Sequence, residues 1–172
     1  MEKSYCIYLP TDLQIPNLTH LTEFPLEDIR LIESFQADCP FIHEGAYIAQ
    51  LNGFMPWKKE HIKTSVSTLI NHWRLLQVEI AQYIATKKTE QIYKGMAHGI
   101  CCFLECLYWM NELPVTFKEG LISSNIKIMP INAEERLLFI ISRVTGYHSF
   151  KQLEELFKEL EKQFAIYLIK NK

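Results

Sequence analysis

The sequence predicts an all-α fold, a single-domain bundle of six or seven helices around one central buried helix at about residues 89–112. Two observations carry this prediction. Apolar side chains recur at steps of three and four over several long stretches, which is the spacing of one helix face. No stretch alternates apolar and polar side chains between hairpin turns, the pattern typical of paired strands.

The central helix is expected where the chain is most apolar, at residues 94–111. One face of this helix is wholly apolar and carries Met96, Ile100, Phe103, Leu104, Leu107 and Met110. A helix that is apolar nearly all round either is buried or spans a membrane. The run is shorter than the ~20 residues of a membrane span, and His98 and Glu105 interrupt it. We therefore expect a buried helix and no membrane segment.

The other elements follow from helix caps and breakers. Residues 1–25 hold three prolines and no sustained period, so they predict an irregular N-terminal arm ahead of one helical domain at 26–172. Asp38, Asn132 and Ser149 are predicted N-caps, because each precedes an apolar periodic run. The further helices are predicted at 26–35, 38–52, 64–85, 132–146 and from 149 onwards, with one possible turn at 117–121.

The second face of the central helix allows two interpretations. It carries His98, Cys102, Glu105 and Cys106, flanked by Gly95 and Gly99. Small residues at steps of three and four let another helix approach closely, and free cysteine packs as a small apolar residue. Alternatively, imidazole and thiolate groups are ligands for zinc or copper. His98 and Cys106 are ~12 Å apart along the axis, so one ion takes only a pair such as His98 and Cys102 plus ligands from another helix. Packing is the favoured interpretation, since no CxxC motif is present.

Glu105 is the unusual residue of this face, because a carboxylate on a buried helix needs a partner or a shifted pKa. An ion pair with Arg74, Arg136 or His98 is the favoured expectation. The alternative is a metal ligand or a general base.

Polar residues set among aromatic ones predict a possible ligand pocket. These candidates are His43, Glu44, Tyr47, Asn111, Arg136, Tyr147 and His148. Tyr147 and His148 are expected in a turn between two helices, where functional side chains are often carried. For His148, bonding to the local backbone is the favoured expectation.

Composition and missing motifs exclude several function classes. The 172 residues are 48% hydrophobic and 22% charged, which is typical of a globular protein, and the net charge is -2. The chain has no phosphate-binding glycine loop, no His-Glu-x-x-His and no Gly-x-Ser-x-Gly. Without a recognisable export signal, the five cysteines are expected to be reduced thiols in the cytoplasm. The sequence therefore favours a non-enzymatic cytoplasmic protein.

Three segments resemble the YpoC-like proteins of Gram-positive bacteria. They are residues 41–57 (FIHEGAYIAQLNGFMPW), 99–115 (GICCFLECLYWMNELPV) and 130–157 (PINAEERLLFIISRVTGYHSFKQLEELF). The resemblance spans about the last three quarters of the chain. It implies a bacterial cytoplasmic helical protein, and it assigns no catalytic or ligand role to any residue.

The sequence-based hypothesis for function is a non-enzymatic module that binds another protein, with a homo-oligomer possible. The alternative is a metal- or small-ligand-binding helical bundle that uses His98, Cys102 and Glu105, with a transition metal as its only cofactor. Nucleic-acid binding is the least favoured class, because it needs a set of lysines on one face. That set is Lys58, Lys59, Lys63, Lys87, Lys88 and Lys94.

Overall fold

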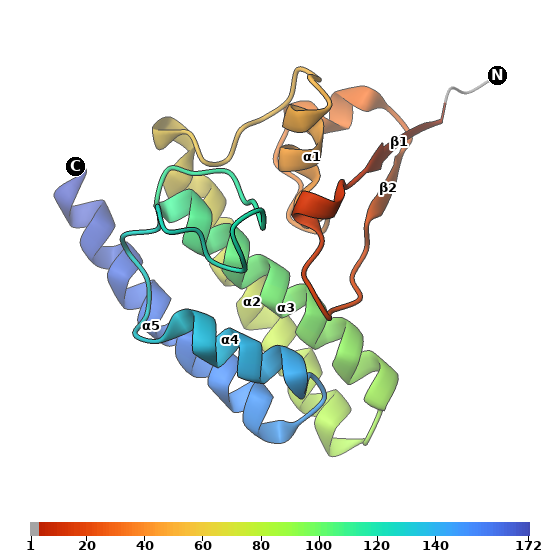
Figure 1. The fold of residues 1–172 in the computed structure, drawn as a ribbon, viewed down its shortest axis with the longest axis vertical. Helices are drawn as coiled ribbons and strands as arrows, with labels where there is room; N and C mark the ends of the chain where they lie inside the picture. Colours follow the sequence, from red (N-terminus) through yellow and green to blue (C-terminus); the bar gives the residue numbers. More distant parts are fainter. Residues whose placement is uncertain (1–3) are drawn as a thin grey trace.

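Three long helices form the body of the protein, whose computed structural model describes residues 4–172. They are α2 (Lys59–Ala85), α3 (Thr89–Met110) and α5 (Tyr147–Lys170). α3 packs against both α2 and α5 (Figure 1). Every residue of α3 from Gly99 to Met110 is buried. This burial agrees with its composition, because a helix without a polar face has to be covered on all sides.

Smaller elements cover the rest of α3. The N-terminal layer consists of β1 (Tyr5–Tyr8), η1 (Thr11–Leu13), β2 (Glu23–Leu26), η2 (Ile29–Glu33) and α1 (Ile42–Ile48). β1 pairs antiparallel with β2, with Tyr5 opposite Leu26 and Tyr8 opposite Glu23. α4 (Ala133–Ser142) packs on α5. Figure 1 shows the N-terminal layer and α4 on different sides of the long helices.

The predicted all-α bundle of six or seven helices is wrong. Residues 4–172 contain five α-helices, two short 3-10 helices and a two-stranded sheet. Each strand has only four residues, and β2 includes Pro25, so neither stands out as an alternating pattern. The predicted helix at 26–35 is strand at its start and then the 3-10 helix η2. Its apolar residues repeat at steps of three, which matches the three residues per turn of a 3-10 helix.

Helix ends also differ from the predicted caps. Asn132 precedes α4 as predicted, but its φ is 54° and its side chain makes no capping hydrogen bond. α5 begins at Tyr147, two residues before the predicted cap Ser149, which is buried in the first turn. α1 follows Phe41, whose φ of 63° lies in the left-handed region that bulky residues rarely adopt. No helix among residues 4–172 is long and apolar enough to cross a membrane.

Two glycines on α3 set its distance from α2. A Cβ atom on Gly99 would lie 2.6 Å from Cζ3 of Trp73, and one on Gly95 would lie 2.7 Å from Cγ1 of Ile80. Trp73 has no room to move, because it is buried and its ring stacks on Phe157 at 4.4 Å. The two helices therefore approach closely at Gly99, which directly follows His98.

Candidate metal centre

Three potential metal ligands meet where α2 and α3 approach closely. His72 directly precedes Trp73 on α2, and His98 directly precedes Gly99 on α3. Cys102 lies one turn after His98. One ligand atom from each of the three lies within 4.8 Å of the others, and the two imidazole centroids are 4.8 Å apart. The Gly99 contact thus brings the two imidazoles together.

Each imidazole of this cluster has one buried nitrogen without a hydrogen-bond partner among residues 4–172. These nitrogens are Nε2 of His72 and Nε2 of His98. The other nitrogen of His72, Nδ1, lies 3.6 Å from Oδ1 of Asp38. A carboxylate behind a metal-binding histidine orients the ring and makes it a better ligand. Asp38 therefore occupies the position of such an orienting carboxylate.

The surroundings tune the protonation of the cluster. Burial lowers the pKa of His98, and the neighbouring His72 lowers it further, so His98 is neutral at pH 7 and its lone pair is free. Burial raises the pKa of the Cys102 thiol well above its ordinary value, and the charge of Glu105 adds to this effect. A metal ion that binds here has to displace the thiol proton.

The three ligand atoms are close enough together for one zinc ion to bind them after small movements. With zinc–nitrogen bonds of about 2.0 Å and a zinc–sulfur bond of about 2.3 Å, the ligand atoms of a tetrahedral site are about 3.3–3.5 Å apart. Ligand atoms within 4.8 Å of one another reach these separations through movements of about 1 Å. Three protein ligands also leave one coordination position free for another molecule.

The predicted metal set is divided by the structure. His98 and Cys102 lie together with His72, whereas Cys106 and Glu105 are not part of that cluster. Cys106 is wholly buried in the core. Oε1 of Glu105 accepts a hydrogen bond of 2.8 Å from the main-chain N–H of Phe41.

The expected ion pairs of Glu105 are not formed. Arg74 pairs with Glu161 at 2.8 Å, and Arg136 pairs with Glu159 at 2.9 Å. Glu105 belongs instead to a second buried group, the acid pair that it forms with Glu44. Burial raises the pKa of Glu105 well above its usual range, and the charge of Glu44 raises it further.

Glu44 ties α1 to the end of α3. Its Oε1 accepts hydrogen bonds from Nε1 of Trp109 at 2.7 Å and from the main-chain N–H of Val115 at 3.2 Å. Burial raises the pKa of Glu44 to about 7, although these two donors act in the opposite direction. The second oxygens of Glu44 and Glu105 have no partner among residues 4–172, which suits carboxyl groups that keep a proton.

His43 and Tyr47, two of the predicted pocket residues, lie one turn apart on α1 but have different surroundings. His43 is buried and stacks on Phe35, with ring centroids 5.7 Å apart, and its Nε2 accepts a hydrogen bond from the Gln36 main chain. Burial lowers the pKa of His43 to about 4. Tyr47 is exposed and meets Trp57 edge to face. His43 therefore belongs to the aromatic core, whereas Tyr47 lies at the surface.

The other predicted pocket residues lie near α4 and at the end of α3. Arg136 and His148 line one surface depression of about 450 Å³. Tyr147 and His148 are in the first turn of α5 and not in a connecting turn. Asn111 donates one hydrogen bond to the Leu107 carbonyl within α3. Three more hold the following loop: Asn111 donates to the Ile128 carbonyl and accepts from the main-chain N–H groups of Lys127 and Ile128.

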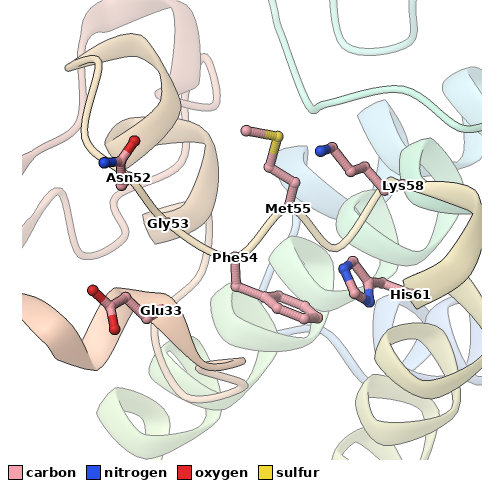
Figure 2. A pocket seen from close by; sticks show the side chains of 7 residues that line it. All are labelled: Glu33, Asn52, Gly53, Phe54, Met55, Lys58 and His61. Carbon is pink, nitrogen blue, oxygen red and sulfur yellow. The ribbon is translucent and has the colours of Figure 1, made fainter.

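A shallow pocket of about 330 Å³ lies between η2 and the start of α2. Figure 2 shows Phe54 and His61 side by side, with the Glu33 carboxylate away from both. The ring centroids of Phe54 and His61 are 4.4 Å apart. The polar groups of this pocket do not converge on one point, so it is a weaker candidate than the cluster of His72, His98 and Cys102.

The lysines considered for nucleic-acid binding are far apart. Lys58, Lys59 and Lys63 lie at the start of α2, and Lys87 and Lys88 follow its end. A helix of 27 residues is ~40 Å long, so the two groups lie at opposite ends of α2.

His72, one of the three ligands, and Asp38, the carboxylate beside it, were not predicted as site residues from the sequence. His72 lies next to the apolar stripe of α2, and Asp38 was expected only as a helix cap. The one usable signal was the glycine pair on α3, which indicates the face that a neighbouring helix approaches. The sequence gives no indication of which α2 residues meet that face.

Comparison with known proteins identifies the family. The model of a family described as YpoC-like protein matches residues 63–172. The chain belongs to the YpoC-like family. It is also 31% identical over 128 residues, 73% of this chain and 77% of the relative, to the uncharacterized protein YpoC of Bacillus subtilis (strain 168). No solved structure matches the chain. The YpoC-like resemblance predicted from the sequence is thus confirmed.

The YpoC-like match bears on the cluster through its range. Residues 63–172 include His72, His98 and Cys102, together with most of α2 and all of α3. The N-terminal layer and Asp38 lie before that range. The three ligand residues therefore belong to the part of the chain that defines the family match.

Proposed function

We propose that the protein binds a transition-metal ion, with zinc as the best-suited metal, through His72, His98 and Cys102. The single observation that carries this proposal is that one ligand atom each from His72, His98 and Cys102 lies within 4.8 Å of the others, in a place where each histidine also has a buried Nε2 without a partner among residues 4–172. Buried polar groups in folded proteins almost always have a partner, so an unpaired pair of nitrogens facing a thiol calls for a ligand. Two imidazoles and a thiolate are a donor set for zinc or copper(I).

The chemistry of the surroundings supports the same proposal. Asp38 lies behind His72 as an orienting carboxylate, at 3.6 Å from its Nδ1. His98 is neutral at pH 7, which is the ligand form of imidazole. A reducing cytoplasm, which we also propose as the location, keeps Cys102 available as a thiol. None of these three points requires an enzymatic reaction.

Metal titration tests the proposal directly. We expect the purified, untagged protein to bind about one zinc ion per chain, and cobalt(II) to give a thiolate-to-metal charge-transfer band. Replacing Cys102 by Ala removes that band. Replacing His72 by Ala weakens binding, because a single helix then supplies only two ligands.

Cys106→Ala is the matched control for the metal titration. Cys106 is as deeply buried as Cys102 and lies one turn further along the same helix, but outside the cluster. We expect C106A to bind zinc as the wild type does. Equal loss of binding in C102A and C106A, or no binding by the folded wild type, contradicts the proposal.

Protein binding is the second candidate function, supported by apolar side chains left exposed around α4. Ile131 is 79% exposed and Leu138 is 56% exposed, with Phe139 beside Leu138 on the same helix. Exposed apolar residues that gather on one surface often mark an interface. Sedimentation analysis tests this candidate. A dimer that becomes a monomer in L138E supports protein binding through α4. A protein that sediments as a monomer and captures no other protein argues against it.

A further inference from the structure

A cavity of about 420 Å³ lies beside the proposed metal site. Its lining residues come from the first half of α3, the loop between β1 and β2 and the segment before α1. Its walls include Leu21, Pro40, Tyr93 and Ala97, with His98 and Asp38 as the residues that it shares with the metal cluster. The cavity and the cluster are therefore neighbours with a common wall.

Most polar groups of the cavity wall already have partners. Nε2 of His20 accepts a hydrogen bond from the Ile15 main chain, and Nδ1 lies 3.1 Å from the Leu21 carbonyl. The Tyr93 hydroxyl accepts a hydrogen bond of 2.9 Å from the Thr19 N–H. The groups with capacity for a new ligand are thus Asp38, His98 and the hydroxyl hydrogen of Tyr93, which donates no hydrogen bond among residues 4–172. The rest of the wall offers apolar surface.

Charge decides which kind of ligand suits this cavity. A divalent ion, the Cys102 thiolate and the Asp38 carboxylate together carry no net charge, so they give no attraction for an anion. Lys94 at the cavity is paired with Glu90 at 2.6 Å, so its charge is largely compensated. Asp38 is a hydrogen-bond acceptor without a donor of its own to offer. A ligand here is best neutral, with one N–H group for Asp38.

We infer that the cavity binds a small, neutral, planar nitrogen heterocycle whose unprotonated nitrogen completes the coordination of an ion held by His72, His98 and Cys102. Its N–H group donates to Asp38, and its apolar part packs against Leu21, Pro40 and Tyr93. The inference rests on the proposed metal site, because three protein ligands leave the fourth position for this nitrogen.

The test uses cobalt(II)-loaded protein and compares 4-phenylimidazole with imidazole. Both present the same nitrogen and N–H group, but only 4-phenylimidazole carries an apolar ring for the cavity. We expect both to change the cobalt absorption spectrum, with 4-phenylimidazole binding about tenfold or more tightly, because burial of its ring adds to the coordination. Equal affinity of the two compounds overturns the inference, as does tighter binding of benzoate, an anion of similar size.

Two variants make the result specific to the cavity. Leu21 is 68% exposed at the rim, so L21A is expected to leave folding and the cobalt spectrum unchanged while it reduces the preference for 4-phenylimidazole. A97L fills the cavity from α3 and is expected to abolish that preference, provided the charge-transfer band shows the metal still bound. An unchanged preference in both variants places the phenyl ring elsewhere and overturns the inference.

The two proposals fail in different ways. If no charge-transfer band forms in the wild type, the metal site itself is wrong and the heterocycle inference falls with it. If the band forms, depends on Cys102 and does not respond to either imidazole, the metal site stands and the cavity has no access to the ion.

Discussion

One face of α3 carries two buried polar groups that differ in how their atoms are satisfied. Near the end of the helix, Glu105 and Trp109 bond to the main chain of Phe41 and to Glu44, and so hold the N-terminal layer in place. One to two turns earlier, His98 and Cys102 meet His72, and both Nε2 atoms lack a partner among residues 4–172. The difference teaches that burial alone does not identify a site. Both groups keep buried atoms without a partner among residues 4–172, but only in the second do potential metal ligands from three side chains lie within 4.8 Å of one another.

The largest effect is expected from removing Glu105. In E105A the N–H of Phe41 loses its acceptor in a buried place and a cavity remains, which costs roughly 4 kcal/mol of unfolding free energy. Urea unfolding at pH 6 measures this loss. E105Q keeps an oxygen for the Phe41 N–H, so we expect it to lose much less. Equal losses in E105A and E105Q contradict a structural role for this hydrogen bond.

Glu44 should make the stability of the protein depend on pH. Its carboxyl group releases a proton at about pH 4.3 in the unfolded chain but only at about 7 in the folded protein. Glu44 holds more protons in the folded state between these values, so its contribution to the unfolding free energy falls as pH rises from about 4.3 to about 7 and then levels off. The loss is on the order of 3 kcal/mol.

E44Q isolates this contribution, because it keeps an oxygen for the Trp109 indole and cannot ionise. Subtracting the unfolding free energy of E44Q from that of wild type removes the contribution of other titrating groups, such as His43, whose pKa is lowered. We expect the unfolding free energy of wild type to fall relative to that of E44Q as pH rises. Parallel pH profiles of the two proteins would show that Glu44 is not the titrating group.

Zinc should stabilise the protein through the cluster and not through the acid pair. At a free zinc concentration of 100 times Kd, binding adds about 2.7 kcal/mol to the unfolding free energy, which a rise in Tm reports. We expect the rise in wild type and in E44Q, and none in C102A. A similar rise in C102A means that zinc binds elsewhere and removes the distinction between the two groups.

The smallest effect is expected from Asp38, which contacts a ligand residue and not the ion. In D38N the amide orients His72 less well, so we expect zinc affinity to fall about 10- to 100-fold while stability without zinc changes little. Competition with a coloured chelator measures this change. E161Q serves as a control, because Glu161 also pairs with α2, through Arg74, but lies outside the cluster.

The long helices could be predicted because each repeats its apolar residues over many turns. α2 begins at Lys59, five residues before the predicted start, because its first turn is polar and shows no period. The N-terminal layer could not be predicted, because four-residue strands and three-residue turns are too short for a pattern to stand out. Its position depends instead on distant partners, among them Glu105.

The cluster shows the same limit. His98 and Cys102 could be paired from the sequence, because residues four apart lie on one helix face. His72 could not, because its place opposite His98 depends on how Trp73 meets Gly99. A tryptophan beside a glycine on two packed helices is a tertiary contact, and no local pattern in one chain encodes which pair meets.

The hydrogen bonds of the acid pair also bear on the order in which the chain folds. They join residues 64, 65 and 71 positions apart, whereas α2 and α3 are neighbours joined by a short turn. Long loops close late in folding, so the helical hairpin is expected to form before the N-terminal layer docks. Until then both glutamates are in water and ionised at neutral pH. Docking of the first fifty residues therefore has to draw protons from the solvent, and a pH indicator in weakly buffered solution would record the last step of refolding.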